Sequence, residues 1–79
     1  MFDSMTGLLN SGTVQQKISD ILASDKGLES AMLVIDVDNL KTINDSFGHQ
    51  TGTAAICSVS NSLKKTFQAT DILGRYGGD

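Results

Sequence analysis

The sequence predicts an α+β fold (α/β, two layers) in which helices pack on a small and incomplete β-sheet. Three patterns with helical spacing accompany one short run that is apolar on both faces, and a second strand-like run stands near the end of the chain. Two helical patterns separate the strand candidates, so a short hairpin cannot join them. A chain of 79 residues provides one small domain, and such domains bury only about 60% of the surface exposed on unfolding.

The first predicted helix lies within residues 13–27. Ser11 or Thr13 is its expected N-cap, because a side-chain oxygen there accepts a hydrogen bond from an open backbone N–H. The apolar residues of this stretch recur with the spacing of one helical face, at Val14, Ile18, Ile21 and Leu22.

The run 32–37, MLVIDV, predicts a central, buried strand. Its side chains are apolar on both faces and partly β-branched, which is typical of a strand covered by other layers on each side. A strand of this kind needs a neighbour on each edge, and the run 71–76, DILGRY, is the one clear candidate. We therefore expect these runs to lie in one sheet that further strands complete.

Two more helical patterns lie between the strand candidates. The first, within residues 39–48, places Leu40, Ile43 and Phe47 on one side and ends at Gly48. The second, within residues 50–67, is the longest in the chain. Its serines lower its intrinsic helix propensity, so it should depend on packing for stability.

Composition narrows the classes of partner. A formal net charge of −3 and six scattered basic residues argue against a nucleic-acid partner. No apolar run approaches the roughly 20 residues of a membrane span, so we expect no membrane contact by these residues. The single cysteine, Cys57, suits a reducing compartment and favours a cytoplasmic location, whether or not a longer parent protein is membrane-anchored.

Two carboxylates interrupt the apolar run, and alternation places Asp36 and Asp38 on the same face. A buried carboxylate is unfavourable unless it is paired, caps a helix or binds a metal ion. Asp38 is best explained as the cap of the following helix, whereas Asp36 stands between Ile35 and Val37 and favours a site for Mg²⁺ and a phosphate. If the two strands are neighbours, Asp79 converges with Asp36 on that metal ion.

Three motifs together resemble the GGDEF domain of diguanylate cyclases. They are DSMTGLLN at 3–10, VIDVDNLKTINDSFGH at 34–49 and DILGRYGGD at 71–79, and they cover almost the whole chain in this order. The resemblance implies that residues 1–79 are a partial GGDEF domain whose C-terminal half is missing, since the chain stops within the Gly-Gly-Asp-Glu-Phe signature. It also implies a sheet of the ferredoxin-like, cyclase-palm type.

The activity implied by the resemblance is the condensation of two GTP molecules into cyclic di-GMP, a bacterial second messenger. Each of two domains facing one another in a homodimer would hold one GTP, with Mg²⁺ or Mn²⁺ as cofactor. The alternative is a degenerate module that binds a nucleotide or serves in dimerisation and regulation. The isolated chain of 79 residues is expected to show no turnover.

The resemblance assigns metal and phosphate roles residue by residue. Asp36 and Asp79 match the catalytic acids that bind the metal ion, and the carbonyl of Val37 matches its backbone ligand. The backbone from Asp38 to Lys41 matches the segment that receives the β- and γ-phosphates. The substrate contacts expected there are made by Asn39, Leu40 and Lys41.

The resemblance also assigns the base contacts, and two of the positions concerned depart from the family pattern. Asn44 matches the residue that hydrogen-bonds guanine, and Gly77 and Gly78 match glycines that let the backbone turn close to the nucleotide. Thr53 stands where the family has an Asp that contacts guanine, so we hypothesise weakened GTP selectivity. Gln68 replaces the Arg of the inhibitory Arg-x-x-Asp motif, which argues against feedback inhibition by product.

Overall fold

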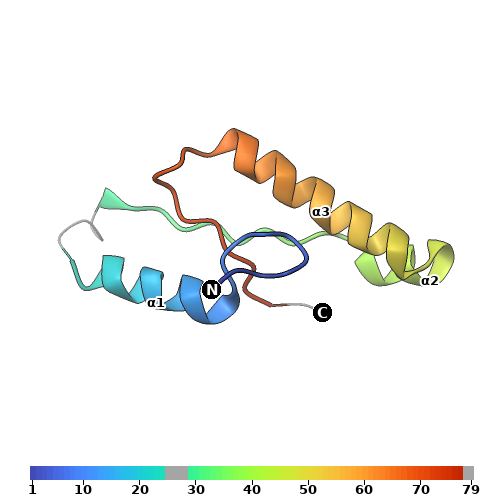
Figure 1. Cartoon of the computed structure of the whole chain (residues 1–79), viewed down its shortest axis with the longest axis horizontal. Helices are drawn as coiled ribbons and strands as arrows, with labels where there is room; N and C mark the ends of the chain where they lie inside the picture. Colours follow the sequence, from blue (N-terminus) through green and yellow to red (C-terminus); the bar gives the residue numbers. More distant parts are fainter. Residues whose placement is uncertain (25–28, 78–79) are drawn as a thin grey trace.

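The structure is a computed structural model that describes residues 1–24 and 29–77. Three helices, α1 (Ser11–Leu22), α2 (Leu40–Phe47) and α3 (His49–Thr66), form the regular structure of these residues. The molecule is elongated, with extents of 47 × 22 × 20 Å. Figure 1 shows the N-terminal loop and the segment after α3 passing between α1 and α3, while α2 lies at the far end of α3.

The predicted α+β fold is wrong for the residues that the structure describes, because they contain helices and no strand. The run 32–37 belongs to no ladder there, and the side chains of Met32 and Val34 are 69% and 84% exposed. The expected partner, the run 71–76, pairs elsewhere. Leu9 N donates to Leu73 O (3.1 Å) and Arg75 N donates to Leu9 O (2.9 Å).

The physical reason for the missing sheet lies in the run 32–37 itself. A strand that is apolar on both faces is stable only between neighbouring strands and under covering layers. The described part of the chain gives this run neither, and the one available partner makes a short parallel bridge between Leu9 and Gly74 instead. The apolar pattern therefore identified residues that must be buried for a strand to be stable. It did not predict the conformation that these residues adopt in this structure.

The three helices confirm the helical patterns, with a correction at the start of α1. The N-cap is Asn10 rather than Ser11 or Thr13, and its side-chain oxygen accepts from Thr13 N at 2.9 Å. The buried face of α1 is centred on Val14, which meets the segment after α3 at Gly74.

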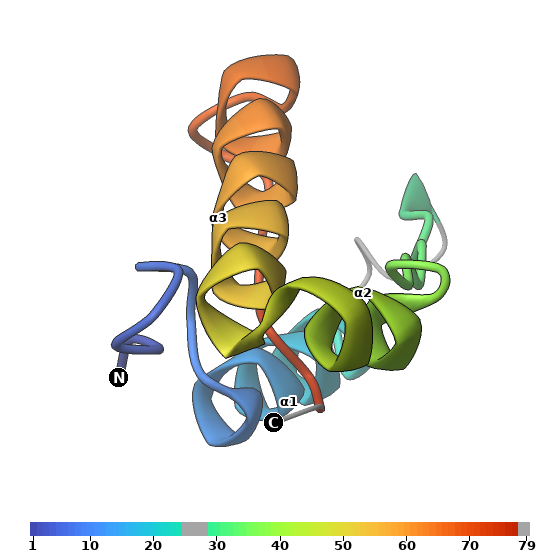
Figure 2. The same cartoon turned by 90° about the vertical axis from the view of Figure 1, so that its right-hand side faces the viewer.

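The helices α2 and α3 follow one another directly and pack together (Figure 2). Gly48 ends α2 with φ +93°, and its N–H donates to Asn44 O at 2.8 Å. The residue before α2 is Asn39, in the left-handed region with φ +61°, and its side chain makes no capping hydrogen bond. Asp38 is thus not the N-cap, and that prediction was wrong.

Candidate functional site

The predicted metal ligands fall partly outside the described residues. Gly78 and Asp79 both lie beyond Gly77, so the expected convergence of Asp79 with Asp36 stays a prediction. Asp36 is exposed and Val37 is half-buried, in the segment that leads into α2. Within residues 1–24 and 29–77, no three His, Cys, Asp or Glu side chains cluster closely enough to hold a metal ion.

The predicted phosphate segment forms a tight turn into α2. Asn39 is the one residue other than glycine with a positive φ among those described, and Leu40 begins the helix immediately after it. The left-handed conformation is unfavourable for most residues but is tolerated by asparagine. The first backbone N–H groups of α2 have no partner within the helix, and the helix dipole makes this end attractive to anions. Lys41 is exposed in the first turn and adds a positive charge.

The base-contact residue Asn44 lies where α2 packs against α3. Its Oδ1 atom is buried and has no hydrogen-bond partner among the described residues. The amide faces Gly52, a buried residue of α3, and a Cβ atom added to Gly52 would overlap Asn44 Oδ1. Thr53 follows Gly52 on α3 and is half-buried. The structure thus brings the predicted residue Asn44 next to the helix that carries Thr53.

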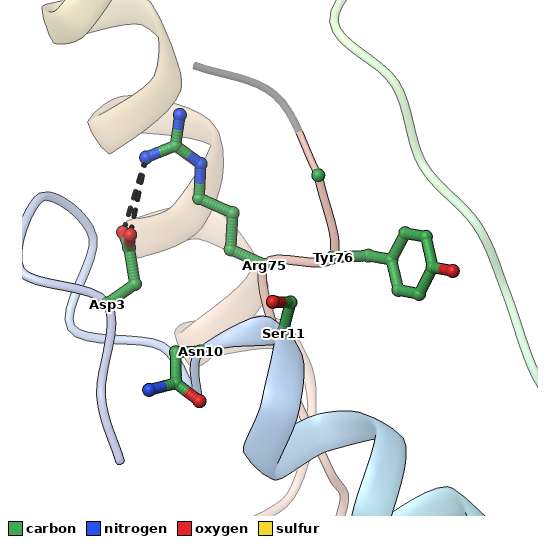
Figure 3. A pocket seen from close by; sticks show the side chains of 6 residues that line it. Asp3, Asn10, Ser11, Arg75 and Tyr76 are labelled. Atoms are coloured by element: carbon green, nitrogen blue, oxygen red, sulfur yellow. Dashed lines mark hydrogen bonds and ion pairs between the residues drawn. The ribbon is translucent and has the colours of Figure 1, made fainter.

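The signature segment approaches α1 and the N-terminal loop rather than the run 32–37. A shallow pocket of about 150 Å³ opens where these parts meet (Figure 3). In this view Arg75 points toward Asp3, whereas Tyr76 points away from both and is 70% exposed. The residues that line the pocket are Asp3, Asn10, Ser11, Arg75, Tyr76 and Gly77.

Sequence reasoning assigned no role to the pair of Asp3 and Arg75. Arg75 Nη1 lies 3.4 Å from Asp3 Oδ2, and the two side chains are 17% and 22% exposed. The Asp3 carboxylate also accepts from Thr6 N (2.9 Å) and from Thr6 Oγ1 (2.7 Å). Lys64 of α3 donates to Thr6 O at 2.6 Å. The N-terminal loop therefore holds Arg75, two residues before Gly77. In the sequence, the only local indication of this arrangement was the spacing of Asp3 and Thr6.

Asp3 makes the stability of this region sensitive to acid. Hydrogen bonds from the Thr6 hydroxyl and backbone N–H, and then the Arg75 guanidinium, hold the pKa of Asp3 below its ordinary value of 3.8. Because the folded pKa is depressed, the stabilisation is present above about pH 5 and is lost progressively as the pH falls below about 4. We expect the thermal unfolding midpoint to fall over this window, and Asp3→Asn to flatten the change, when unfolding is followed by circular dichroism.

Thr6 offers the matched control for this acid response. Thr6→Ser keeps the hydroxyl that bonds Asp3 and should keep the pH dependence, whereas Thr6→Val removes that hydrogen bond and should weaken it. An unchanged pH profile in both Asp3→Asn and Thr6→Val would show that Asp3 is not the group responsible.

The helices in the described part of the chain are too short or too polar to cross a membrane. The match to known proteins is more informative. The family model described as "Diguanylate cyclase, GGDEF domain" matches residues 1–79. The chain is 33% identical over 79 residues to the probable diguanylate cyclase DgcC of Escherichia coli K12, covering 98% of the chain and 21% of that relative.

Two further relatives show similar coverage. The diguanylate cyclase DgcP of Escherichia coli K12 is 34% identical over 98% of the chain and 23% of its own length. The diguanylate cyclase DgcS of Shewanella oneidensis is 31% identical over 100% of the chain and 27% of its own length. The chain thus spans between 21% and 27% of the length of these proteins. Because the family model covers every residue, this chain belongs to the GGDEF-domain family of diguanylate cyclases.

Proposed function

We propose that the protein containing this chain joins two GTP molecules into cyclic di-GMP. The 3′-hydroxyl of one GTP attacks the α-phosphate of the other, a phosphodiester bond forms, and pyrophosphate leaves; a second such step closes the ring. Two copies of the domain, each holding one GTP, face one another during the reaction. The observation that carries this proposal is the buried Asn44 Oδ1, an acceptor with no partner among the described residues, in a chain that the family model matches over residues 1–79.

Asn44 suits guanine for a simple chemical reason. Its side-chain oxygen accepts hydrogen bonds, and the guanine edge presents donors at N1–H and N2–H. An acceptor that is buried without a partner destabilises the free protein, and a bound donor removes that penalty. Asn44 therefore supports recognition of a base that presents N–H donors.

The start of α2 suits the phosphates of the same nucleotide. Its open N–H groups point along the helix axis toward the preceding turn, and Lys41 offsets part of the phosphate charge. The short distance along the chain from Asn39 to Asn44 fits one nucleotide whose phosphates meet the turn and whose base meets α2.

The oxygen ligands available near this turn fit a hard cation. Asp36 offers a carboxylate and Val37 a backbone carbonyl, the donor types that Mg²⁺ and Mn²⁺ take, and Asp79 would add a second carboxylate. The bound cation would neutralise charge on the phosphates. The role of this chain's own residues is to hold the phosphates and to orient the guanine. Catalysis therefore consists mainly of positioning and electrostatic stabilisation.

Thr53 favours a second function, a regulatory module that binds a nucleotide without turning it over. A carboxylate can accept from both N1–H and N2–H of guanine, whereas the Thr53 hydroxyl cannot do so equally well. Base recognition in this chain then depends more heavily on Asn44.

Product formation tests the proposed function. The longest natural polypeptide that contains these residues is incubated with GTP and Mg²⁺, and nucleotides are separated by chromatography. We expect cyclic di-GMP from GTP, no corresponding product from ATP, and no product when EDTA removes the cation. Thr53→Asp should increase the preference for GTP. Nucleotide binding without product would favour the regulatory module, and equal binding of GTP and ATP would overturn guanine recognition.

A further inference from the structure

We propose that Gly52 is a positioning residue for Asn44. The absence of a side chain at Gly52 creates the space in which the Asn44 amide lies, with Oδ1 buried against α3. The inference deepens the proposed function and rests on it where the bound base is taken to be guanine. It assigns the role to a residue of α3 that does not itself touch the nucleotide.

The atoms nearest to the position of the missing Gly52 side chain all belong to one residue. The three atoms nearest to a Cβ built on Gly52 are Oδ1, Cγ and Nδ2 of Asn44, with Cγ at 2.8 Å and Nδ2 at 3.3 Å. The Oδ1 atom would overlap that Cβ outright. The space opposite Gly52 is therefore occupied by this amide, and any residue with a Cβ would compete with it.

The backbone between the two residues fixes their separation. Gly48 N donates to Asn44 O at 2.8 Å, and Gly52 N donates to Gly48 O at 3.3 Å. Gly48 adopts φ +93°, a conformation that favours glycine, and it joins α2 to α3 directly. Because this connection is short and hydrogen-bonded, Asn44 and Gly52 cannot readily move apart to admit a larger side chain.

The unpartnered oxygen indicates why the space matters. The great majority of buried polar atoms in proteins have a hydrogen-bond partner, so a buried acceptor without one requires an explanation. Here the Oδ1 atom is held against Gly52, and it has no hydrogen-bond partner among the described residues. A ligand that supplies an N–H donor between α2 and α3 would satisfy this atom.

Gly52→Ala separates this positioning role from folding. The added methyl group meets the end of a flexible side chain, which can rotate away, rather than backbone. Alanine also has a higher helix propensity than glycine, so α3 itself should not be weakened. The expected result is a folded protein in which the Asn44 amide has left its place.

The first measurement is made without any nucleotide, on the ¹⁵N-labelled chain. The side-chain NH₂ resonances of Asn44 are assigned by their loss in Asn44→Ala. We expect Gly52→Ala to shift them while the helical circular dichroism stays unchanged. Gly12→Ala on α1 is the matched control, because its Cβ would meet only Asn10 Oδ1, at an ordinary 3.8 Å, and it should leave these resonances in place. Unshifted Asn44 resonances in Gly52→Ala would overturn the proposal.

The second measurement is a double-mutant cycle on the longest natural polypeptide that contains these residues. Binding of GTP in the presence of Mg²⁺ should weaken about tenfold in Gly52→Ala and in Asn44→Ala, the loss of one hydrogen bond. The double variant should bind no more weakly than Asn44→Ala alone, because the two changes remove the same contact. Effects that multiply would overturn the positioning role.

The cycle also distinguishes the role of Gly52 from the proposed contact between Asn44 and guanine. If Gly52→Ala shifts the Asn44 resonances but Asn44→Ala binds GTP normally, Gly52 does position Asn44 and the proposed contact with guanine is wrong. If Asn44→Ala weakens GTP binding but Gly52→Ala does not, the guanine contact stands and the role of Gly52 is wrong.

Discussion

Replacing Asp36 with Asn is expected to lower the Mg²⁺-dependent formation of cyclic di-GMP by at least about 100-fold, because a metal ion stabilises transition-state charge by several kcal/mol. Asn keeps the size of the side chain and removes the negative charge that a hard cation needs. The change should act on the metal rather than on the fold, since Asp36 is exposed and lies outside the helices. Initial rates of the longest natural polypeptide that contains these residues are measured over a range of Mg²⁺ concentrations.

Asp38→Asn is the matched control for Asp36→Asn. Asp38 lies two residues further along the same segment, is also exposed, and carries the same charge. Its replacement should change the rate only a few-fold, because the family pattern gives the metal to Asp36. Equal losses in the two variants would show that the negative charge of the segment matters and not a ligand at Asp36. Full activity in Asp36→Asn would remove Asp36 from the site.

Gly74→Ala is expected to destabilise the fold strongly. A Cβ atom there would lie 2.5 Å from both Cβ and Cγ2 of Val14 and 2.9 Å from its Cγ1. Val14 is 7% exposed and β-branched, so in α1 it has essentially one rotamer and cannot turn aside. Overpacking of this kind lowers the free energy of unfolding by about 1–3 kcal/mol. Urea unfolding followed by far-UV circular dichroism measures it.

Two further variants test the cause of the Gly74 effect. Gly77→Ala, three residues along, should be nearly neutral, since no atom of the described residues beyond its chain neighbours lies within 4 Å of the added Cβ. Val14→Gly combined with Gly74→Ala should be more stable than the sum of the single changes predicts, because the first change removes the Cβ of Val14 as well as both γ carbons. Strictly additive effects would show that the two residues do not meet.

The helices could be predicted because their signals are local. Apolar spacing and Gly48 fixed the course of α2 and α3, and the structure confirms both. The α1 pattern was also correct, but the cap was misplaced by one residue (Ser11) or three (Thr13). Asn10, Ser11 and Thr13 are all suitable capping residues, and only the backbone at Asn10 decides between them.

The absence of the sheet could not be predicted, because β-pairing depends on the partner segment as well as on the strand itself. The run 32–37 has the composition of a buried strand, yet in the described residues it remains exposed while Leu9 takes the hydrogen bonds of the segment around Gly74. No periodicity within 32–37 carries information about that competition. Tyr76 shows the same limit, since it belongs to the run 71–76 that was expected to form the second strand, and it lies exposed.

Candidate site residues could be proposed where a motif is contiguous, whereas contacts built across the chain were missed. Asn44 and the turn at Asn39 lie within one unbroken motif, so the resemblance identified them together. The ion pair between Asp3 and Arg75 joins residues at opposite ends of the chain. The space at Gly52 exists because glycine lacks a Cβ atom, and only the structure shows that Asn44 occupies it. Both features depend on tertiary geometry, which residue type alone does not provide.

The N-terminal loop is hydrogen-bonded to the last described segment, so distant parts of the described chain are held together near its start. Asn10 N donates to Met1 O, Leu9 is hydrogen-bonded to Leu73 and Arg75, and Arg75 meets Asp3, so the first ten residues hold the last described segment in place. Exposed segments outside these contacts are the places where a break in the backbone is tolerated. The run 32–35 is such a segment, since a cut there breaks none of these closing contacts. A chain cleaved at that run should keep the junctions of α1 with Gly74 and of α2 with α3.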